Sequence, residues 1–212
     1  MSNFPASLTD RFHRFKHRYF VQNADHYEEL AKYGQSPDTM VIACCDSRAD
    51  PETIFSAKPG ELFVVRNVAN LVPPYETDGR FHGVSAAIEF AVLNLRVSNL
   101  VIMGHSSCGG VKAALDQSAA IETEAHFITR WMSLLDEARL RVLAATQTCK
   151  HTEKAVALEK ECVKTSLQNL RTFPFVKEME DKGKLGLYGS YFDIATGSLW
   201  VLNERTGEYY NL

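Results

Sequence analysis

Four short apolar runs, each of strand length, constrain the fold of this chain more than any other feature. They are residues 40–43, 61–66, 99–104 and 186–194. Between the second and the third run, apolar residues recur at the spacing of a helix. These residues are Val84, Ile88, Ala91, Val92 and Leu95. Strands that alternate with helices predict an α/β fold with a central, mostly parallel β-sheet flanked by helices.

The second half of the chain adds an antiparallel edge and more helices. Residues 191–203 read as two strands around a Thr-Gly turn, which predicts a hairpin at one edge of the sheet. Residues 122–171 are rich in Glu, Lys, Arg, Ala and Leu and contain no Gly or Pro. They predict two or more helices with a break near residues 146–154. Residues 71–80 are expected to form a loop.

The N-terminus carries an aromatic pattern that predicts a short helical arm. Phe12, Phe15 and Tyr19 are spaced by three and four residues and mark one face of a helix, with Ser7 or Thr9 as its N-cap. Basic residues between the aromatic ones would also suit a transit peptide or a helix on a membrane surface. Packing on the rest of the protein or on a partner subunit is the favoured interpretation.

Composition favours one globular domain over residues 1–212, with a helical arm at 1–24 and an α/β core at 25–212. The chain is 45% hydrophobic and 23% charged, and its formal net charge of −3 provides no basic field for a nucleic acid. No stretch approaches the roughly 18 apolar residues of a membrane span, and the N-terminus lacks the apolar core of a signal peptide. We therefore expect a cytoplasmic protein with a small-molecule site and neither nucleic-acid nor membrane partners.

The five cysteines indicate metal binding or catalysis, because disulfides are rare in a reducing compartment. Two of them lie in the run VIACCDSRAD, directly after the first predicted strand. If this strand continues, Cys44, Asp46 and Arg48 point to one side, and Cys45 and Ser47 point to the other. The two adjacent cysteines are therefore expected to differ in role.

A second run, GHSSCGG, follows the third predicted strand. If a helix begins there, His105 and Cys108 lie three residues apart on one helical face. The carboxyl ends of parallel strands meet at one edge of a sheet, where α/β folds assemble their sites. Cys44, His105 and Cys108 then form a site for one Zn²⁺ per chain, and the open fourth position is typical of catalytic zinc. The alternative is two small buried cysteines and a hydrogen-bonded core histidine.

The residues that follow Cys44 and Cys108 in the sequence each allow two interpretations. Asp46 and Arg48 form either a structural ion pair or a catalytic pair, in which the carboxylate ligates zinc or leaves that position to water. Gly109 and Gly110 at a helix start would expose backbone N–H groups to an anionic product. They would equally suit a tight strand-to-helix turn.

These five polar residues together resemble the motif of a known enzyme family. Cys44, Asp46, Arg48, His105 and Cys108 match the zinc and Asp-Arg motif of the β-class carbonic anhydrases. The resemblance extends over about residues 30–203. Its longest segments are residues 58–74, 83–115 and 186–202.

The resemblance implies a lyase that hydrates carbon dioxide reversibly to bicarbonate and a proton. The nucleophile is a hydroxide bound to zinc, which Cys44, His105 and Cys108 hold. Asp46, kept ionised by Arg48, orients this nucleophile. Members of the family form dimers or higher assemblies, with the site near the subunit interface. We therefore expect a homodimer or a higher even-numbered homo-oligomer.

The resemblance is greatest to the plant-type subgroup, which implies four substrate-binding residues. Gln35, nine residues before Cys44, would hydrogen-bond the substrate, and Phe63 and Val68 would form the apolar pocket wall. The backbone N–H of Gly109 would contact the bound anion. A tyrosine of this subgroup falls at Phe90, so the hydrogen bond from its hydroxyl is absent here.

Two alternative functions share these residues. A carbon disulfide hydrolase-like enzyme could use the same fold and zinc ligands, because CO₂ and CS₂ are both small linear electrophiles. A catalytically silent, zinc-binding scaffold or sensor would need neither Asp46 nor Arg48, so the presence of both favours an enzyme.

Overall fold

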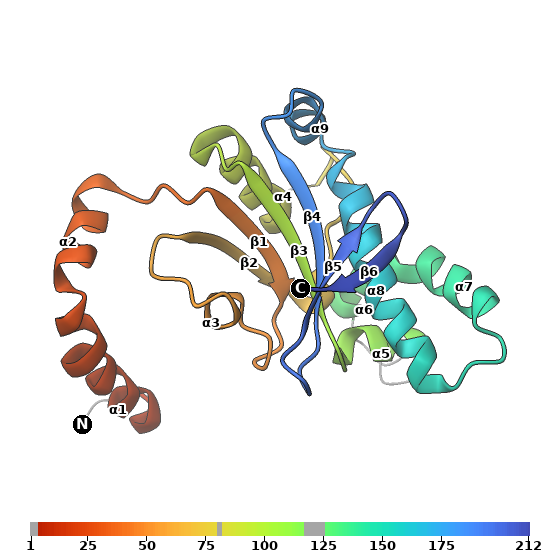
Figure 1. Ribbon diagram of the computed structural model, residues 1–212, viewed down its shortest axis with the longest axis horizontal. Coiled ribbons are helices and arrows are strands. Elements are labelled where there is room, and N and C mark those ends of the chain that lie inside the picture. The colour runs from red at the N-terminus through yellow and green to blue at the C-terminus, as the bar shows by residue number, and fades with distance from the viewer. Residues whose placement is uncertain (1–3, 80–81, 117–125) are drawn as a thin grey trace.

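The computed structural model describes residues 4–79, 82–116 and 126–212, and its centre is a six-stranded sheet (Figure 1). The strands are β1 (Thr39–Cys44), β2 (Leu62–Asn67), β3 (Asn99–His105), β4 (Gly186–Phe192), β5 (Leu199–Asn203) and β6 (Glu208–Asn211). Their order in the sheet is β2-β1-β3-β4-β5-β6. The first four strands run parallel, and β5 and β6 pair antiparallel. The expected mostly parallel sheet with an antiparallel edge is confirmed, although β6 was not expected.

Helices cover the sheet and connect its strands (Figure 1). They are α3 (Pro51–Ile54), α4 (Gly83–Glu89) with its π-helical continuation η3 (Phe90–Leu95), α5 (Gly109–Asp116), α6 (His126–Met132), α7 (Asp136–Ala145), α8 (His151–Leu170) and α9 (Pro174–Asp181). Short 3₁₀ segments are η2 (Val68–Asn70) and η5 (Ser133–Leu135). The break between α7 and α8 falls where the sequence predicts it. Residues 122–125 of the expected helices and residue 80 of the expected loop lie outside the described ranges.

The N-terminal arm consists of α1 (Ala6–Arg14), the π-helical η1 (Phe15–Phe20) and α2 (Ala24–Tyr33), and it projects away from the sheet (Figure 1). The expected N-cap is wrong, because α1 begins directly after Pro5, whose carbonyl accepts the N–H groups of Leu8 and Thr9. The predicted aromatic face exists, with the rings of Phe15 and Tyr19 stacked at 5.8 Å. Among the described residues, no helix is long and apolar enough to span a membrane.

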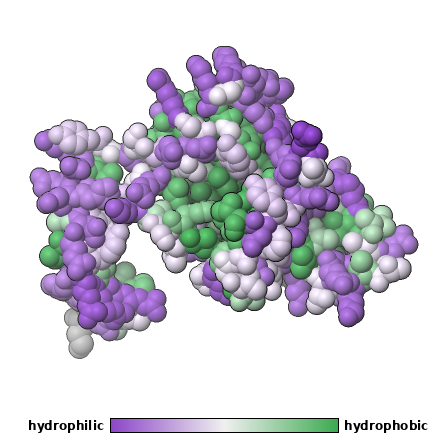
Figure 2. Space-filling view, in the orientation of Figure 1, coloured by the Kyte–Doolittle hydropathy of each residue, from purple (hydrophilic) through white to green (hydrophobic). Residues whose placement is uncertain are grey.

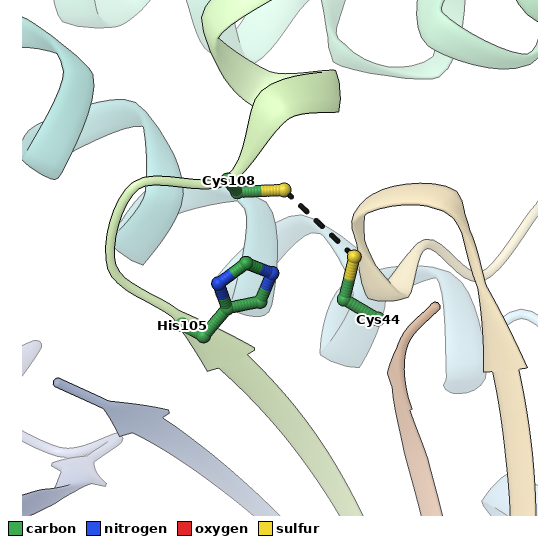
Figure 3. A group of neighbouring side chains, drawn as sticks. All are labelled: Cys44, His105 and Cys108. Carbon is green, nitrogen blue, oxygen red and sulfur yellow. Dashed lines mark hydrogen bonds between the residues drawn. The ribbon is translucent and has the colours of Figure 1, made fainter. Parts of the chain in front are cut away.

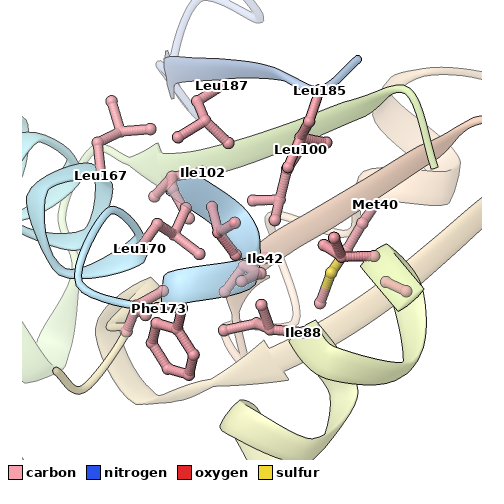
Figure 4. Packing of buried hydrophobic residues seen from close by; sticks show 14 of the residues in the cluster. Met40, Ile42, Ile88, Leu100, Ile102, Leu167, Leu170, Phe173, Leu185 and Leu187 are labelled. Atoms are coloured by element: carbon pink, nitrogen blue, oxygen red, sulfur yellow. The ribbon is translucent and has the colours of Figure 1, made fainter. Parts of the chain in front are cut away.

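The core forms where α8 and α4 pack on the central strands (Figure 4). β1 is buried on both faces, as expected for a strand in the middle of a parallel sheet. Helix α8 approaches the sheet closely over two strand glycines. A Cβ atom on Gly189 would lie 2.8 Å from Val163 Cγ1, and one on Gly104 would lie 2.7 Å from Val163 Cγ2. These glycines therefore set the distance between α8 and the strands that end at the functional site.

Gly189→Ala tests this close packing. We expect the variant to lose roughly 1–3 kcal/mol of unfolding free energy, because overpacking a buried contact forces side chains or backbone to shift. Urea unfolding measures the loss. Gly83→Ala is the matched control, since no atom of the described residues lies within 4 Å of a Cβ atom built there. Equal stability of the two variants would contradict this account of the packing.

Candidate metal centre

Three predicted ligands, far apart in the sequence, meet at the carboxyl edge of the sheet (Figure 3). Cys44 is the last residue of β1 and His105 the last residue of β3, and these two strands are parallel neighbours. The Sγ atoms of Cys44 and Cys108 lie 3.9 Å apart, and the ligand atoms of all three residues lie within 4.8 Å of one another. All three side chains are buried. The pairing of parallel strands thus brings together residues that the sequence separates by about sixty positions.

A tight turn, and not a helix, brings Cys108 back to His105. The expectation that both residues share a helical face is wrong, because β3 ends at His105 and α5 begins only at Gly109. Ser107 has a left-handed backbone (φ 59°), which reverses the chain between the two ligands. The N–H of Ser106 donates to the carbonyl of Phe192 and anchors the turn to β4. The turn, and not the spacing of a helix, therefore places the side chains of His105 and Cys108 next to each other.

The orientation of His105 suits a metal ligand. Its Nδ1 lies 2.9 Å from the carbonyl oxygen of Ser106, so Nδ1 carries the proton and donates to this oxygen. Its Nε2 is buried, and none of the described residues offers it a hydrogen bond. A buried acceptor without a partner beside two thiols is the arrangement expected of a zinc ligand, and metal-bound histidines commonly donate their other N–H to a carbonyl. Two thiolates and a neutral imidazole fit tetrahedral zinc with one open position.

The two thiols have opposite electrostatic environments. The hydrogen bond from Cys108 lowers the pKa of Cys44, against the effect of burial, and contacts with His105 and the N–H groups of Asp46 and Ala69 lower it further. The same hydrogen bond raises the pKa of Cys108, and burial raises it further. Zinc binds cysteines as thiolates, so zinc binding must displace the thiol protons of this pair.

Asp46 and Arg48 form a bidentate ion pair just beyond β1. Arg48 Nε donates to Asp46 Oδ1 at 2.9 Å, and Arg48 Nη2 donates to Asp46 Oδ2 at 2.7 Å. These hydrogen bonds hold the pKa of the Asp46 carboxyl well below its usual range. Nη2 also donates to the carbonyl of Ser107 at 3.2 Å, which connects the pair to the turn before Cys108. Of the two predicted arrangements for Asp46, the structure contains the one paired with the guanidinium.

Two charged residues that support the site were missed by the sequence analysis. Arg66 on β2 donates from Nε to the Cys44 carbonyl at 2.9 Å and from Nη2 to the Asp46 carbonyl at 2.6 Å. Glu159 on α8 accepts the N–H of Cys108 at 3.0 Å and the hydroxyl of Tyr191 at 2.7 Å. Burial raises the pKa of Glu159. The sequence did offer one signal for these residues, because each is a charged residue among apolar ones in its strand or helix. The metal-ligand motif does not include them, so they were not singled out.

Two of the four expected substrate-binding residues lie beside the metal ligands. Gly109 follows Cys108 directly and begins α5. Val68 begins the segment after β2, and a Cβ atom on Gly110 would lie 2.8 Å from Val68 Cγ1. The carbonyl of Val68 accepts the indole N–H of Trp131 at 2.8 Å. Gly109 and Val68 therefore lie next to the segments that carry or contact the metal ligands.

The other two expected residues lie far from the ligands of their own chain. Gln35 is exposed and precedes β1, at the strand end opposite to Cys44. Phe63 pairs in register with Met40, four residues before Cys44, which is about 13 Å along the strand. The ring of Phe63 lies 5.9 Å from that of Phe90. One chain thus does not gather all four residues around its metal ligands.

Known proteins are similar to this chain in sequence and in fold. The model of the carbonic anhydrase family matches residues 39–199. Beta carbonic anhydrase 3 of Arabidopsis thaliana is 38% identical over 200 residues, which cover 92% of this chain and 76% of that protein. The β-carbonic anhydrase CafA of Aspergillus fumigatus has a TM-score of 0.80 at 32% identity, covering 93% of this chain and 91% of that one. One of two tetrameric β-carbonic anhydrases from Sordaria macrospora has a TM-score of 0.82 at 28% identity, covering 93% and 95%.

The matched region contains every element that builds the metal centre, from β1 through the start of β5. The identity to the Arabidopsis protein extends over nearly the whole chain. The ligand set of two cysteines and one histidine agrees with the use of zinc by this family. With its sequence, its fold and its ligand geometry in agreement, the chain belongs to the β-class carbonic anhydrase family.

Proposed function

We propose how the residues of this zinc-dependent carbonic anhydrase divide the work of converting CO₂ reversibly to bicarbonate and a proton. The observation that carries the proposal is the convergence of Cys44, His105 and Cys108 next to an ion-paired carboxylate. Zinc, when bound to these three residues, acidifies water so that it attacks CO₂ near neutral pH. The remaining steps belong to side chains and backbone groups of the protein.

Asp46 is proposed to aim the nucleophile. Because Arg48 holds its carboxylate ionised, Asp46 accepts a hydrogen bond from the attacking oxygen and leaves a lone pair directed at carbon. The Gly109 N–H at the start of α5 then donates to the oxygen that becomes negative. Val68 contributes an apolar wall against which CO₂ lies. Asp46 and Gly109 lie within two positions of a zinc ligand in the sequence, and Val68 precedes Ala69, whose N–H contacts Cys44 Sγ.

Gln35 and Phe63 are proposed to serve the site of a second subunit. Neither lies beside the metal ligands of its own chain. Gln35 is exposed, and β2, which carries Phe63, is the edge strand of the sheet that the described residues form. The edge strand β2 is half-exposed along its whole length although most of its residues are apolar, and an open apolar edge normally requires covering. Figure 2 shows apolar surface gathered between the arm and the sheet.

A homodimer or a higher even-numbered homo-oligomer follows from this arrangement. The arm projects from the body and exposes Phe12 by 56% and Tyr19 by 41%, so it can pack on a neighbouring subunit. The Sordaria macrospora relatives are described as tetrameric. We also propose a cytoplasmic location, because all five cysteines are free and a reducing compartment keeps them so.

Cys44→Ser tests the metal centre. The variant is expected to lose zinc and activity together, because a serine hydroxyl does not ionise near neutral pH and replaces a thiolate ligand poorly. Stopped-flow CO₂ hydration and zinc content, measured on the same sample, check this result. Cys45→Ser is the matched control, since Cys45 is the exposed neighbour of Cys44. This variant is expected to keep both its zinc and its activity.

Full zinc content in Cys44→Ser would refute the ligand assignment. A zinc-loaded wild-type protein without CO₂ hydration above the buffer rate would indicate the scaffold or sensor function. Turnover of CS₂ that exceeds turnover of CO₂ would indicate the carbon disulfide hydrolase-like enzyme.

Asp46→Asn tests the orienting carboxylate. We expect zinc content to stay at the wild-type level and kcat to fall about 100-fold or more, the size of effect typical for loss of a positioned catalytic carboxylate. The same two measurements on one sample check it. Asp181→Asn on α9, where the carboxylate pairs with Lys177 at the surface, is the control and should retain the wild-type rate. A rate within twofold of wild type for Asp46→Asn would contradict its role.

Mixed dimers test whether Gln35 acts across the interface. A subunit with Gln35→Ala and a subunit with Asp46→Asn, combined in one purified heterodimer, leave one site intact if Gln35 serves the partner. We expect this heterodimer to show about half of the wild-type rate per dimer, while each homodimer is impaired at both sites. If Gln35 serves its own chain, both sites are defective and the heterodimer stays as slow as the homodimers.

A further inference from the structure

The segment after β2 has an unusual backbone directly beside the metal ligands. Ala69 (φ 64°) and Asn70 (φ 47°) are consecutive, buried and left-handed, although neither is glycine. This conformation is unfavourable for residues with a Cβ atom and persists only where the surroundings impose it. The conformation points the N–H of Ala69 at Cys44 Sγ, at 3.4 Å. An N–H that donates to a thiolate stabilises its negative charge.

Helix α8 supplies the groups that hold this segment. Cys162 Sγ donates to the Ala69 carbonyl at 3.0 Å. One turn later, Ser166 Oγ donates to the Asn70 carbonyl at 3.0 Å and accepts the N–H of Val72 at 3.2 Å. Residues four apart lie on the same face of a helix, so the two side chains form one polar strip facing the segment.

Both side chains are fully buried on a helix whose other inward residues are mostly apolar. Burial raises the pKa of the Cys162 thiol, so its proton stays available for donation. An alanine at either position would fill most of the same space and leave a buried carbonyl unpaired. Packing alone therefore does not explain why these two positions are polar, whereas the hydrogen bonds to the two carbonyls do.

We propose that Cys162 and Ser166 are positioning residues of the metal centre, which hold the left-handed segment so that the Ala69 N–H stays on the Cys44 sulfur. Their hydrogen bonds go to residues 69–72, and none of those among the described residues goes to a metal ligand. The proposal refines the proposed zinc site and rests on Cys44 being a zinc ligand. It adds two residues of α8 that support the metal centre without ligating the metal.

Ser166→Ala is the first test, with zinc affinity and the cobalt-substituted spectrum as readouts. We expect the zinc dissociation constant to rise about 10-fold, as is typical when a group that supports a ligand is removed. The thiolate-to-cobalt absorption band should also shift, because the Cys44 sulfur loses its donor. Ser190→Ala is the matched control: Ser190 is equally buried on β4, and its hydroxyl donates to the Ile102 carbonyl at 3.4 Å, away from this segment. It should change neither readout.

The Cys162 variants provide a second test that does not depend on how Ser166→Ala folds. Cys162→Ala should weaken zinc binding and shift the cobalt band, whereas Cys162→Ser keeps a donor and should restore both. Wild-type affinity and spectrum in Ser166→Ala, or equal effects of the two Cys162 variants, would overturn the proposal. None of these measurements uses CO₂. An absence of CO₂ hydration would therefore refute the proposed function, whereas the zinc affinity and the cobalt spectrum would still decide the role of Cys162 and Ser166.

Discussion

Two buried sulfur atoms that must carry negative charge determine much of the architecture around them. An anion removed from water is costly unless it is paired or hydrogen-bonded. Zinc neutralises the charge of Cys44 and Cys108 when bound, but the protein also directs donors at the site. The Ala69 N–H reaches the Cys44 sulfur, and the turn before α5 keeps Cys108 beside it. The loops at this edge of the sheet are therefore shaped by the need to present N–H groups and ligands to one point.

Helix α8 connects this site to the hydrophobic core. On one side it lies against the strand glycines of β3 and β4, and on the same inward surface it carries Glu159, Cys162 and Ser166. Glu159 binds the N–H of Cys108, whereas the other two bind the segment that serves Cys44. Each left-handed residue costs about 1–3 kcal/mol, and each hydrogen bond returns about 0.5–1.5 kcal/mol, so several bonds are needed to hold the segment. Core packing of α8 thus fixes both the turn that carries Cys108 and the segment whose Ala69 N–H contacts Cys44.

The sequence could predict the sheet and the three ligands because both depend on local patterns. Apolar runs of strand length mark the strands, and a rare Cys or His directly after such a run marks the carboxyl edge of the sheet. The turn at Ser107 could not be predicted, because a serine gives no signal for a left-handed backbone. Arg66 and Ser166 were missed for a different reason. A polar residue in a strand or helix looks like a surface residue until the buried face is known, and only tertiary structure identifies that face.

Strand β2 links catalysis to assembly in the proposed enzyme. Its carboxyl end supports the metal centre of its own chain, since Arg66 binds the Cys44 carbonyl and the following segment presents Ala69 to the sulfur. Its other end carries Phe63, which is proposed to form the pocket wall of a partner subunit. A displacement of this edge strand would therefore disturb two sites at once, one through its backbone support and one through its substrate pocket. In the proposed dimer a second subunit would cover this edge and restrain the strand, whereas an isolated chain would have neither the complete pocket nor this restraint.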